Sequence, residues 1–290
     1  MRVLKNIYQI DAFTDKLFQG NSAAVVYCEE ELLDTEMLQI AKEMNLSETA
    51  FISLSARADF KLKWFTPSVE VKLCGHATIA SLHYLKEREL IKEYSTVTFE
   101  TLSGIIECGV VNDLYFMKLP IPEFQEFKGD YNGILSVLGV DRQVINDNYP
   151  FILQDNGNLF IYILSLDVIK NLKPNFKEML KLINEKLEYT EVTVFSIETT
   201  EEESDAHLRF FAPYYGIDED PVTGSANGPL LMVLRKLGLV DLNTEGKIFT
   251  FEQGDELGRT GRVKVEYSPI WNELKIYGNA VTVMKGDIFY

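Results

Sequence analysis

The sequence lacks the features of several large protein classes. Its three cysteines, Cys28, Cys74 and Cys108, are far apart and form neither a Cys-x-x-Cys motif nor a zinc-ligand spacing with histidine. An odd, dispersed set of cysteines argues against a disulfide framework and favours a reduced, cytoplasmic protein. No apolar run approaches membrane-spanning length, and the first residues, 1–13, lack the apolar core of a signal peptide. We therefore expect no metal and no membrane partner.

Basic residues are also scarce. The 290 residues include 28 Lys and Arg against 44 Asp and Glu, which gives a formal net charge of −16 at pH 7. Such a surface repels phosphate, so nucleic acids and anionic membranes are poor partners. Hydrophobic residues, by contrast, make up 46% of the chain, which is enough for one large core or two ordinary ones.

One segment of the chain occurs twice. Residues 59–67 read DFKLKWFTP and residues 205–213 read DAHLRFFAP, with every position displaced by 146 residues, as from Pro67 to Pro213. Each copy is followed by an acidic stretch and then by a four-residue motif with glycine in second place, CGHA at 74–77 and TGSA at 223–226. Both motifs lead into an apolar segment with the composition of a buried helix, 77–90 and 224–237. A duplicated unit predicts two related lobes that meet in a cleft.

Strand patterns surround both expected helices. Each lobe is therefore expected to be a curved antiparallel sheet wrapped around its buried helix, in the α+β class. The segment 120–130 has two prolines and no clear period, so we expect the lobes to divide there, at 1–122 and 123–290. Asp34 is expected to cap a further helix. The expected strands are 7–13, 23–28, 49–53, 59–65, 96–101, 105–111, 114–119, 248–251, 262–267 and 274–283.

The first turn of each central helix is a candidate anion site. Its amides have no partner within the helix and lie at the positive end of the helix dipole. Gly75 and Gly224 allow a ligand close to the backbone, and His76 and Ser225 add side-chain donors at matching places. The alternative is that both glycines only fit tight strand-to-helix turns. Two copies at matched places favour a ligand site over that alternative.

One carboxyl group of the first copy is expected to have no equivalent in the second. Glu48 lies between Leu46 and Phe51 before an expected buried strand, and 146 residues further the chain has Val194. Partial removal from water suits a carboxyl group to proton transfer near neutral pH. The alternative is a surface glutamate at a strand edge, which is the usual environment of this residue. Spacing alone leaves both interpretations open.

Several motifs, in their order along the chain, resemble those of the PhzF family, the phenazine-biosynthesis-like proteins with the diaminopimelate-epimerase fold. They are DAFT at 11–14, GNSAAVV at 20–26, NLSETAF at 45–51, WFTP at 64–67, LCGHAT at 73–78, RFFAP at 209–213 and EDPVTGSA at 219–226. The resemblance spans nearly the whole chain. It implies two pseudo-symmetric lobes, each a barrel-like sheet around a central helix, with the final strand, 279–290, able to return to the first lobe.

The resemblance also implies roles for four side chains. Glu48 matches the glutamate that shuttles a proton in the family's best-understood isomerase, while His76, Asp220 and Ser225 match residues that line the substrate. From the residues alone, Asp220 is interpreted as an acceptor for a substrate ammonium or hydroxyl group, or as a cap for the loop that leads into the second helix.

Other candidate catalysts are weaker. Racemases of this fold use two opposed cysteines, and the resemblance places Cys74 at one of these positions but Thr223 at the other. A threonine hydroxyl is too weak an acid and base for that role, so Cys74 is expected to be an inert buried thiol. His83 and His207 lie in an expected helix and strand, where a histidine is more often a hydrogen-bonded core residue than a catalyst.

These observations predict a cofactor-independent isomerase of a small carboxylate-bearing metabolite. In this prediction Glu48 moves the proton, and the helix N-termini at Gly75 and Gly224 bind the carboxylate. No cofactor is expected. The protein is expected to be a cytoplasmic homodimer. Two alternatives stay open, a single-base epimerase or racemase and a catalytically silent metabolite-binding protein. The substrate cannot be read from the sequence.

Overall fold

The computed structural model of the protein describes residues 3–30, 32–242 and 244–290. Met1 and Arg2, which open the expected N-terminal strand pattern, lie outside the described residues. The chain divides into two compact units. Unit 1 contains Met1–Leu119, Gly261–Val263 and Lys275–Tyr290, and unit 2 contains Pro120–Thr260 and Lys264–Leu274. In the described part of the chain, none of the helices has the length and apolar composition needed to cross a membrane.

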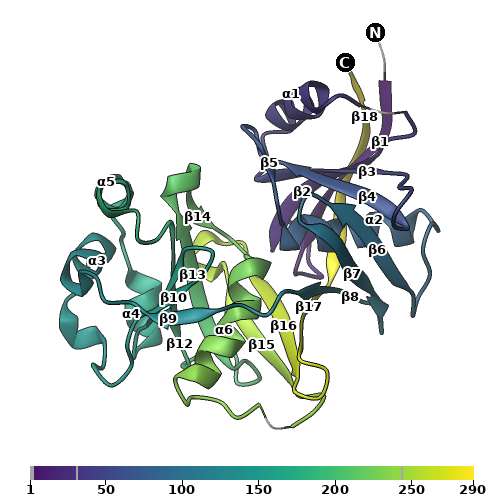
Figure 1. Cartoon of the computed structure of the whole chain (residues 1–290). Helices are drawn as coiled ribbons and strands as arrows, with labels where there is room; N and C mark the ends of the chain where they lie inside the picture. The colour runs from purple at the N-terminus through teal and green to yellow at the C-terminus, as the bar shows by residue number, and fades with distance from the viewer. Residues whose placement is uncertain (1–2, 31, 243) are drawn as a thin grey trace. The chain divides into compact units, whose positions relative to one another are not determined.

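Unit 1 is built on one mixed sheet (Figure 1). At one end β1 (Val3–Ala12) pairs antiparallel with both β18 (Ala280–Phe289) and β2 (Asn21–Tyr27). Beyond β2 the pairing continues through β3 (Glu48–Ser53), β4 (Phe60–Phe65), β6 (Thr96–Thr101), β7 (Gly104–Val111) and β8 (Leu114–Leu119), and the short β5 (Glu70–Val71) pairs with β4.

The expectation of purely antiparallel sheets is wrong. The pairs β2–β3 and β4–β6 of unit 1 are parallel. The physical reason is the helix between the two strands of each pair, because a crossover through a helix returns the chain in the same direction.

The expected strand 274–283 is also two strands, β17 (Glu273–Gly278) and β18, separated at Asn279. The carbonyl of Asn279 accepts a hydrogen bond of 2.8 Å from the amide of Phe13.

Two helices cover the two faces of the unit 1 sheet. Helix α1 (Asp34–Met44) follows β2 and packs Met37 and Ile40 into a cluster with Phe51 and Phe65 of the sheet. Helix α2 (Gly75–Glu87) contacts β1, β2, β3, β7, β8 and β18. Ten of its 13 residues are buried. Its apolar composition on all sides therefore reflects the strands that pack around it.

The strands of unit 2 also pair in both directions. Pairing runs from β9 (Phe124–Glu126) through β10 (Ile152–Gln154), β11 (Asn158–Tyr162) and β12 (Glu191–Ser196) to β13 (Ala206–Ala212), which also pairs with β14 (Ile217–Asp220) and β15 (Ile248–Gln253). The pairs β11–β12 and β13–β15 are parallel. The remaining strand, β16 (Gly261–Ser268), has residues in both units.

Three helices cover one face of the unit 2 sheet. They are α3 (Tyr131–Leu138), α4 (Leu166–Asn171) and α5 (Phe176–Lys186), and their apolar side chains form one buried cluster with Val192, Val194 and Phe211 of the strands. A fourth helix, α6 (Gly224–Lys236), contacts β11. Short 3-10 helices occupy Arg142–Val144 (η1), Pro213–Tyr215 (η2) and Asp255–Leu257 (η3).

The order of elements repeats between the units. In unit 1 the chain passes from β2 through α1, β3, β4, β5 and α2 to β6, and in unit 2 from β11 through α4, α5, β12, β13, β14 and α6 to β15. Helices α2 and α6 both begin at a glycine and both have 13 residues. The internal sequence repeat is therefore a repeat of secondary structure.

Candidate active site

In unit 1 the structure brings Glu48 and His76 together. Glu48 is the first residue of β3 and is 9% exposed, while His76 is the second residue of α2 and is 4% exposed. Glu48 Oε2 lies 3.1 Å from His76 Nε2, which is an ion-pair distance. Two residues 28 positions apart in the sequence therefore meet at the starts of β3 and α2.

His76 is held from its other nitrogen as well. Nδ1 lies 3.2 Å from the side-chain amide of Asn21 and 3.6 Å from Cys74 Sγ. Burial alone would lower the pKa of His76, but its contacts with Cys74 and Glu48 outweigh burial and raise the pKa well above its usual value. Since Asn21 Nδ2 can only donate to Nδ1, the ring proton lies on Nε2, which faces Glu48.

One oxygen of Glu48 is underused. Oε2 is buried and, among the described residues, has no partner in hydrogen-bond geometry, although it is at ion-pair distance from His76. Buried polar atoms are nearly always hydrogen-bonded, so an oxygen left this way calls for an explanation. A ligand that presents a donor or a removable proton to Oε2 would provide one.

Cys74 lies beside this pair but stays protonated. It is the residue before α2 and is 6% exposed. Burial, and next the charge of Glu48, raise the pKa of the Cys74 thiol to about 11. A thiolate base is therefore scarce at neutral pH, in line with an inert buried thiol. Glu48, Cys74 and His76 nevertheless offer oxygen, sulfur and nitrogen atoms within 4.8 Å of one another, an arrangement that could hold a divalent ion.

In unit 2 a second polar group surrounds Asp220, the last residue of β14. Asp220 is 7% exposed, and its Oδ2 accepts a hydrogen bond of 2.5 Å from Thr223 Oγ1. Gln253 of β15 donates to the carbonyl of Asp220 at 3.0 Å and to Thr223 Oγ1 at 3.1 Å. Its Oε1 accepts from Asn227 of α6 at 2.7 Å. Gln253 belongs to no sequence motif and lies 33 residues from Asp220, so its contact with Asp220 could not be predicted from the sequence.

The N-termini of α2 and α6 match each other. Ser225 follows Gly224 as His76 follows Gly75, and Ser225 is half-buried. The residues before the two helices, Cys74 and Thr223, have extended backbones and make no side-chain capping hydrogen bond. Neither residue therefore caps the first amides of its helix through its side chain, which is compatible with an anion site.

The expectation that the second copy lacks a carboxyl group equivalent to Glu48 is wrong. In unit 1 Thr49 of β3 pairs with Phe65 of β4, and in unit 2 Val192 of β12 pairs with Phe211 of β13. From Phe65 to Phe211 is 146 residues, but from Thr49 to Val192 is 143. The connection between the paired strands is three residues longer in unit 2, so a constant displacement fails there.

The true counterpart of Glu48 is Glu191. Each is the first residue of its strand, and each has a partner in a parallel pair, Ala23 for Glu48 and Asn158 for Glu191. Glu191 is half-buried. Burial, and next the negative charge of Asp220, raise the pKa of Glu191 to about 7.

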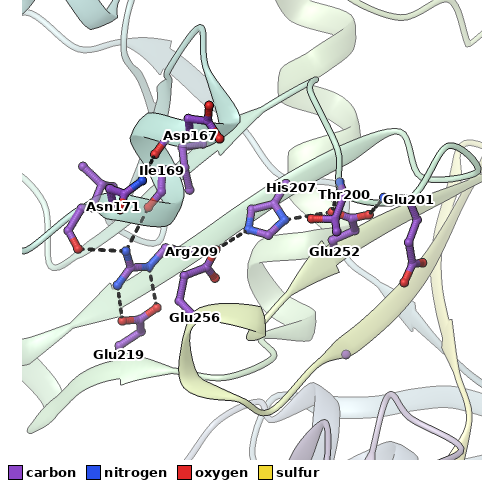
Figure 2. Close-up of polar contacts among 12 residues, drawn as sticks. Asp167, Ile169, Asn171, Thr200, Glu201, His207, Arg209, Glu219, Glu252 and Glu256 are labelled. Carbon is purple, nitrogen blue, oxygen red and sulfur yellow. Dashed lines mark hydrogen bonds and ion pairs between the residues drawn. The ribbon is translucent and has the colours of Figure 1, made fainter.

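A third polar group surrounds His207 of β13, and Figure 2 shows it between two carboxylates. Nδ1 lies 2.9 Å from Glu252 and Nε2 lies 2.9 Å from Glu256. Burial lowers the pKa of His207, but the two carboxylates outweigh it and raise the pKa to about 9. His207, Glu252 and Asp255 also present ligand atoms within 4.8 Å of one another. Both ring nitrogens are hydrogen-bonded, so the prediction of a hydrogen-bonded core histidine is confirmed.

A surface hollow of about 320 Å³ lies elsewhere on unit 2. It is lined by Asn132, Leu135, Ser136, Gly139, Val140, Asp141 and Arg142. None of the candidate site residues lines it, so the candidate chemistry and this hollow are separate features.

Comparison with known proteins identifies the family. The family model for phenazine biosynthesis-like proteins (PhzC-PhzF) matches residues 10–286. An uncharacterized isomerase of Clostridium acetobutylicum is 38% identical over 304 residues, covering 98% of this chain and 97% of that protein. The crystal structure of a PhzF-family protein of Bacillus anthracis superposes with a TM-score of 0.90 at 30% identity and covers 100% of both chains.

A more distant structure shares the fold alone. A predicted epimerase of Pseudomonas aeruginosa superposes with a TM-score of 0.78 at 18% identity, and 99% of each chain is covered. The mixed fold of large sheets and few helices agrees with both solved structures. The resemblance that the motifs indicated is thereby confirmed. The chain belongs to the phenazine biosynthesis-like protein family and is an isomerase of that family.

Proposed function

We propose that the protein is a cofactor-independent isomerase of a small carboxylate-bearing metabolite, in which Glu48 carries a proton from one substrate atom to another. The observation that carries the proposal is the contact of the buried Glu48 Oε2 with His76 Nε2 at 3.1 Å. A buried carboxylate held beside a histidine is suited to accept a proton from carbon.

The proposed proton transfer has two halves. In the first, the Glu48 carboxylate takes a proton from a substrate carbon, and the electron pair of that C–H bond moves toward the substrate carbonyl or carboxylate. The Nε2–H of His76, which faces Glu48, then becomes available to the negative charge that develops on the substrate. In the second half, Glu48 returns the proton to a different atom, so the enzyme ends in its starting state.

The proposed binding residues come from both units. The amides at Gly75 and Gly224 would hold the substrate carboxylate, since each opens a helix whose preceding residue provides no side-chain cap. Ser225 would add a hydroxyl donor at the position that His76 has in α2. Asp220, held by Thr223, would accept a hydrogen bond from a substrate ammonium or hydroxyl group. The convergence of Glu48, His76, Asp220 and Ser225 on one substrate stays a prediction.

The finer description of the fold is part of this proposal. We infer two pseudo-symmetric lobes, each with its sheet around a central helix, α2 in one and α6 in the other. Support comes from the repeated order of elements and from the strands that α2 contacts. A homodimer in the cytoplasm also stays a proposal, which gel filtration with light scattering and cell fractionation can test.

Solvent deuterium exchange tests the proposed function. The protein would be incubated in deuterated water with a panel of α-amino acids and α-hydroxy acids, and each compound followed by proton NMR and mass spectrometry. An isomerase incorporates deuterium at carbon and forms an isomer, and a single-base epimerase forms only the opposite stereoisomer. Binding without deuterium incorporation for any compound would instead identify a metabolite-binding protein.

A further inference from the structure

The ring of His76 lies between side chains of two neighbouring strands of unit 1. Its Nε2 is 3.1 Å from Glu48 Oε2 of β3, and its Nδ1 is 3.2 Å from the side-chain amide nitrogen of Asn21, the first residue of β2. Asn21 is only 2% exposed. The proposed mechanism gives a role to the ring and to Glu48 but none to Asn21.

Strand register places Asn21 and Glu48 on the same face of the sheet. Ala23 of β2 pairs with Glu48 of β3 in the parallel direction. Paired residues share a face, and so do residues two apart in a strand, which adds Asn21 to the set. Helix α2, which carries His76, contacts both strands. The backbone of unit 1 therefore fixes the groups that hold the ring, one at each nitrogen.

Both neighbours of His76 Nδ1 can donate a hydrogen bond to it. The amide nitrogen of Asn21 has two N–H groups and does not accept. Cys74 Sγ, 3.6 Å from Nδ1, belongs to a protonated thiol, because burial raises the pKa of Cys74 to about 11. Nδ1 is therefore the acceptor nitrogen of the ring, and the ring proton is on Nε2.

We propose that Asn21 is a positioning residue of the isomerase, which holds His76 in the form that is protonated at Nε2 only. The inference rests on the proposed function and deepens it. A ring with a proton on Nε2 cannot take the proton that Glu48 has removed from the substrate, because its free nitrogen, Nδ1, faces Asn21 rather than Glu48. That proton therefore stays on Glu48 until it returns to the substrate, and the Nε2–H stays available to negative charge on the substrate.

Asn21 also opposes a second proton on the ring. Burial disfavours the charged form of His76, whereas Cys74 and Glu48 favour it. A second proton would have to bind at Nδ1, where it would point at an N–H group of Asn21. A buried N–H that faces another donor is costly, so the amide of Asn21 favours the ring with one proton.

The charge beside the ring comes from Glu48, at Nε2. Asp11 of β1 is buried, but it pairs with Ser22 of β2 and so lies on the opposite face of the sheet. Titratable groups of β8 and β18 contact α2 further along the helix, in the pairs Tyr115–His83 and Lys285–Glu87. The state of Nδ1 is therefore set by Asn21 and the neutral Cys74.

The first test measures ring protonation in the protein alone. The chain has three histidines, so long-range proton–nitrogen NMR spectra of the nitrogen-15-labelled protein can resolve each ring, and His76→Gln assigns the signals of His76. At pH 8 we expect the native ring to carry a proton on Nε2 and none on Nδ1. A proton on Nδ1 of the native ring would overturn the proposal.

Asn21→Asp changes the hydrogen-bonding role of residue 21 and keeps its shape. Aspartate places an acceptor where the amide of Asn21 donates, so the ring should carry a proton on both nitrogens at pH 8. It would then lie between two carboxylates, the arrangement that His207 has between Glu252 and Glu256. The native ring form in a folded Asn21→Asp variant would overturn the proposal.

Asn21→Ala removes the donor without adding a charge, and it decides the question if Asn21→Asp does not fold. Its ring should no longer be restricted to the Nε2–H form, and an unchanged ring would show that Asn21 does not set it. The matched control is Ser22→Ala in the same strand, because Ser22 accepts a hydrogen bond from Gln9 at 3.0 Å rather than contacting His76. The His76 signals of this control should match those of the native protein.

The second test measures turnover of the compound that incorporates deuterium fastest in the panel. Asn21→Asp should lower kcat at least ~10-fold, a part of the usual share of acid–base catalysis, and keep the KM within a factor of about three, because residue 21 acts on His76 rather than on the substrate. Ser22→Ala should keep both constants. A raised KM with native kcat in Asn21→Asp would make Asn21 a substrate-binding residue and overturn the positioning role.

The outcomes separate the inference from the proposed function, because ring protonation is measured without substrate. Native deuterium incorporation together with an unchanged ring in the Asn21 variants would overturn the role of Asn21 and leave the isomerase intact. An absence of deuterium incorporation by the native protein with every compound would overturn the isomerase, while the NMR spectra would still decide whether Asn21 holds His76 in the Nε2–H form.

Discussion

Arg209 of β13 holds Glu219 of β14 through two parallel hydrogen bonds, from Nε at 2.8 Å and from Nη2 at 2.7 Å (Figure 2). Its Nη1 also donates to the carbonyls of Ile169 and Leu172 at the end of α4. Arg209 is 6% exposed, so these bonds replace the water that its charge has lost. Arg209 thereby links β14, which ends at Asp220, to β13 and to the end of α4.

Arg209→Lys is expected to lower the free energy of unfolding by about 2–4 kcal/mol, because lysine keeps the charge but cannot satisfy Glu219 and both carbonyls at once. Urea unfolding followed by circular dichroism measures the change. The matched control is Lys63→Gln at the equivalent position of β4, where Lys63 lies 3.6 Å from Glu70 and its side chain is 19% exposed. That control should cost no more than about 1 kcal/mol. Equal losses in the two variants would contradict the account.

The buried ion pairs of His207 predict a loss of stability at alkaline pH. The pKa of His207 is about 9 in the folded protein and about 6.5 in the unfolded chain, so folding favours the charged ring. This stability is fully present below pH ~6.5 and is lost as pH rises through about 9. His207→Gln should therefore cost about 3 kcal/mol or more at pH 6 and progressively less toward pH 10.

Urea unfolding of the native protein and of His207→Gln between pH 6 and pH 10 measures this dependence. The control is His83→Gln, because burial lowers the pKa of His83, and its contribution cannot decline between pH 6.5 and 9 for the same reason. A stability difference for His207→Gln that stays constant over the whole range would count against a charged ring.

Cys74→Ala separates the glutamate mechanism from a thiol mechanism. The thiol stays protonated at neutral pH because burial raises its pKa to about 11, so alanine should leave turnover within a factor of a few. The lost packing should lower the free energy of unfolding by about 1 kcal/mol. Both are measurable on one preparation, by deuterium incorporation and by urea unfolding. An inactive Cys74→Ala together with an active Glu48→Gln would require a thiolate base instead.

A chelator tests whether the group of Glu48, Cys74 and His76 holds a metal ion. These side chains could bind one, but an ion there would occupy the acceptor position of Glu48 that the proposed mechanism uses. Dialysis against EDTA, followed by metal analysis, should leave deuterium incorporation unchanged. Loss of activity that zinc restores would show that the ion, rather than the carboxylate alone, activates the substrate.

Elements with a strong local sequence pattern could be predicted from the sequence. Strands β6 and β8 agree with the expected bounds, 96–101 and 114–119, and the starts of α2 and α6 follow from a glycine before an apolar run. The region 131–204 received no assignment. Helix α4 has six residues and α3 has eight with a glycine inside, so neither is long enough to show a clear helical period.

The candidate site was predicted in part, for a physical reason. Motifs contain residues that are close in sequence, and they pointed to Glu48, His76, Asp220 and Ser225. The partners of these residues come from distant strands, as Gln253 does for Asp220. The pairing register of the strands decides which residues are equivalent. Because the connection between the paired strands is three residues longer in unit 2, the equivalent of Glu48 is Glu191 and not Val194.

The most direct test of the account is the turnover of Glu48→Gln. Glutamine preserves the size of the side chain and can still contact His76 Nε2, so the fold and much of the ligand affinity should persist. The matched control is Glu43→Gln, an exposed carboxyl group on α1. Deuterium incorporation into the substrate, measured in deuterated water, should fall at least ~100-fold in Glu48→Gln and stay at the native rate in Glu43→Gln. Native-like incorporation by Glu48→Gln would contradict the central claim that Glu48 moves the proton.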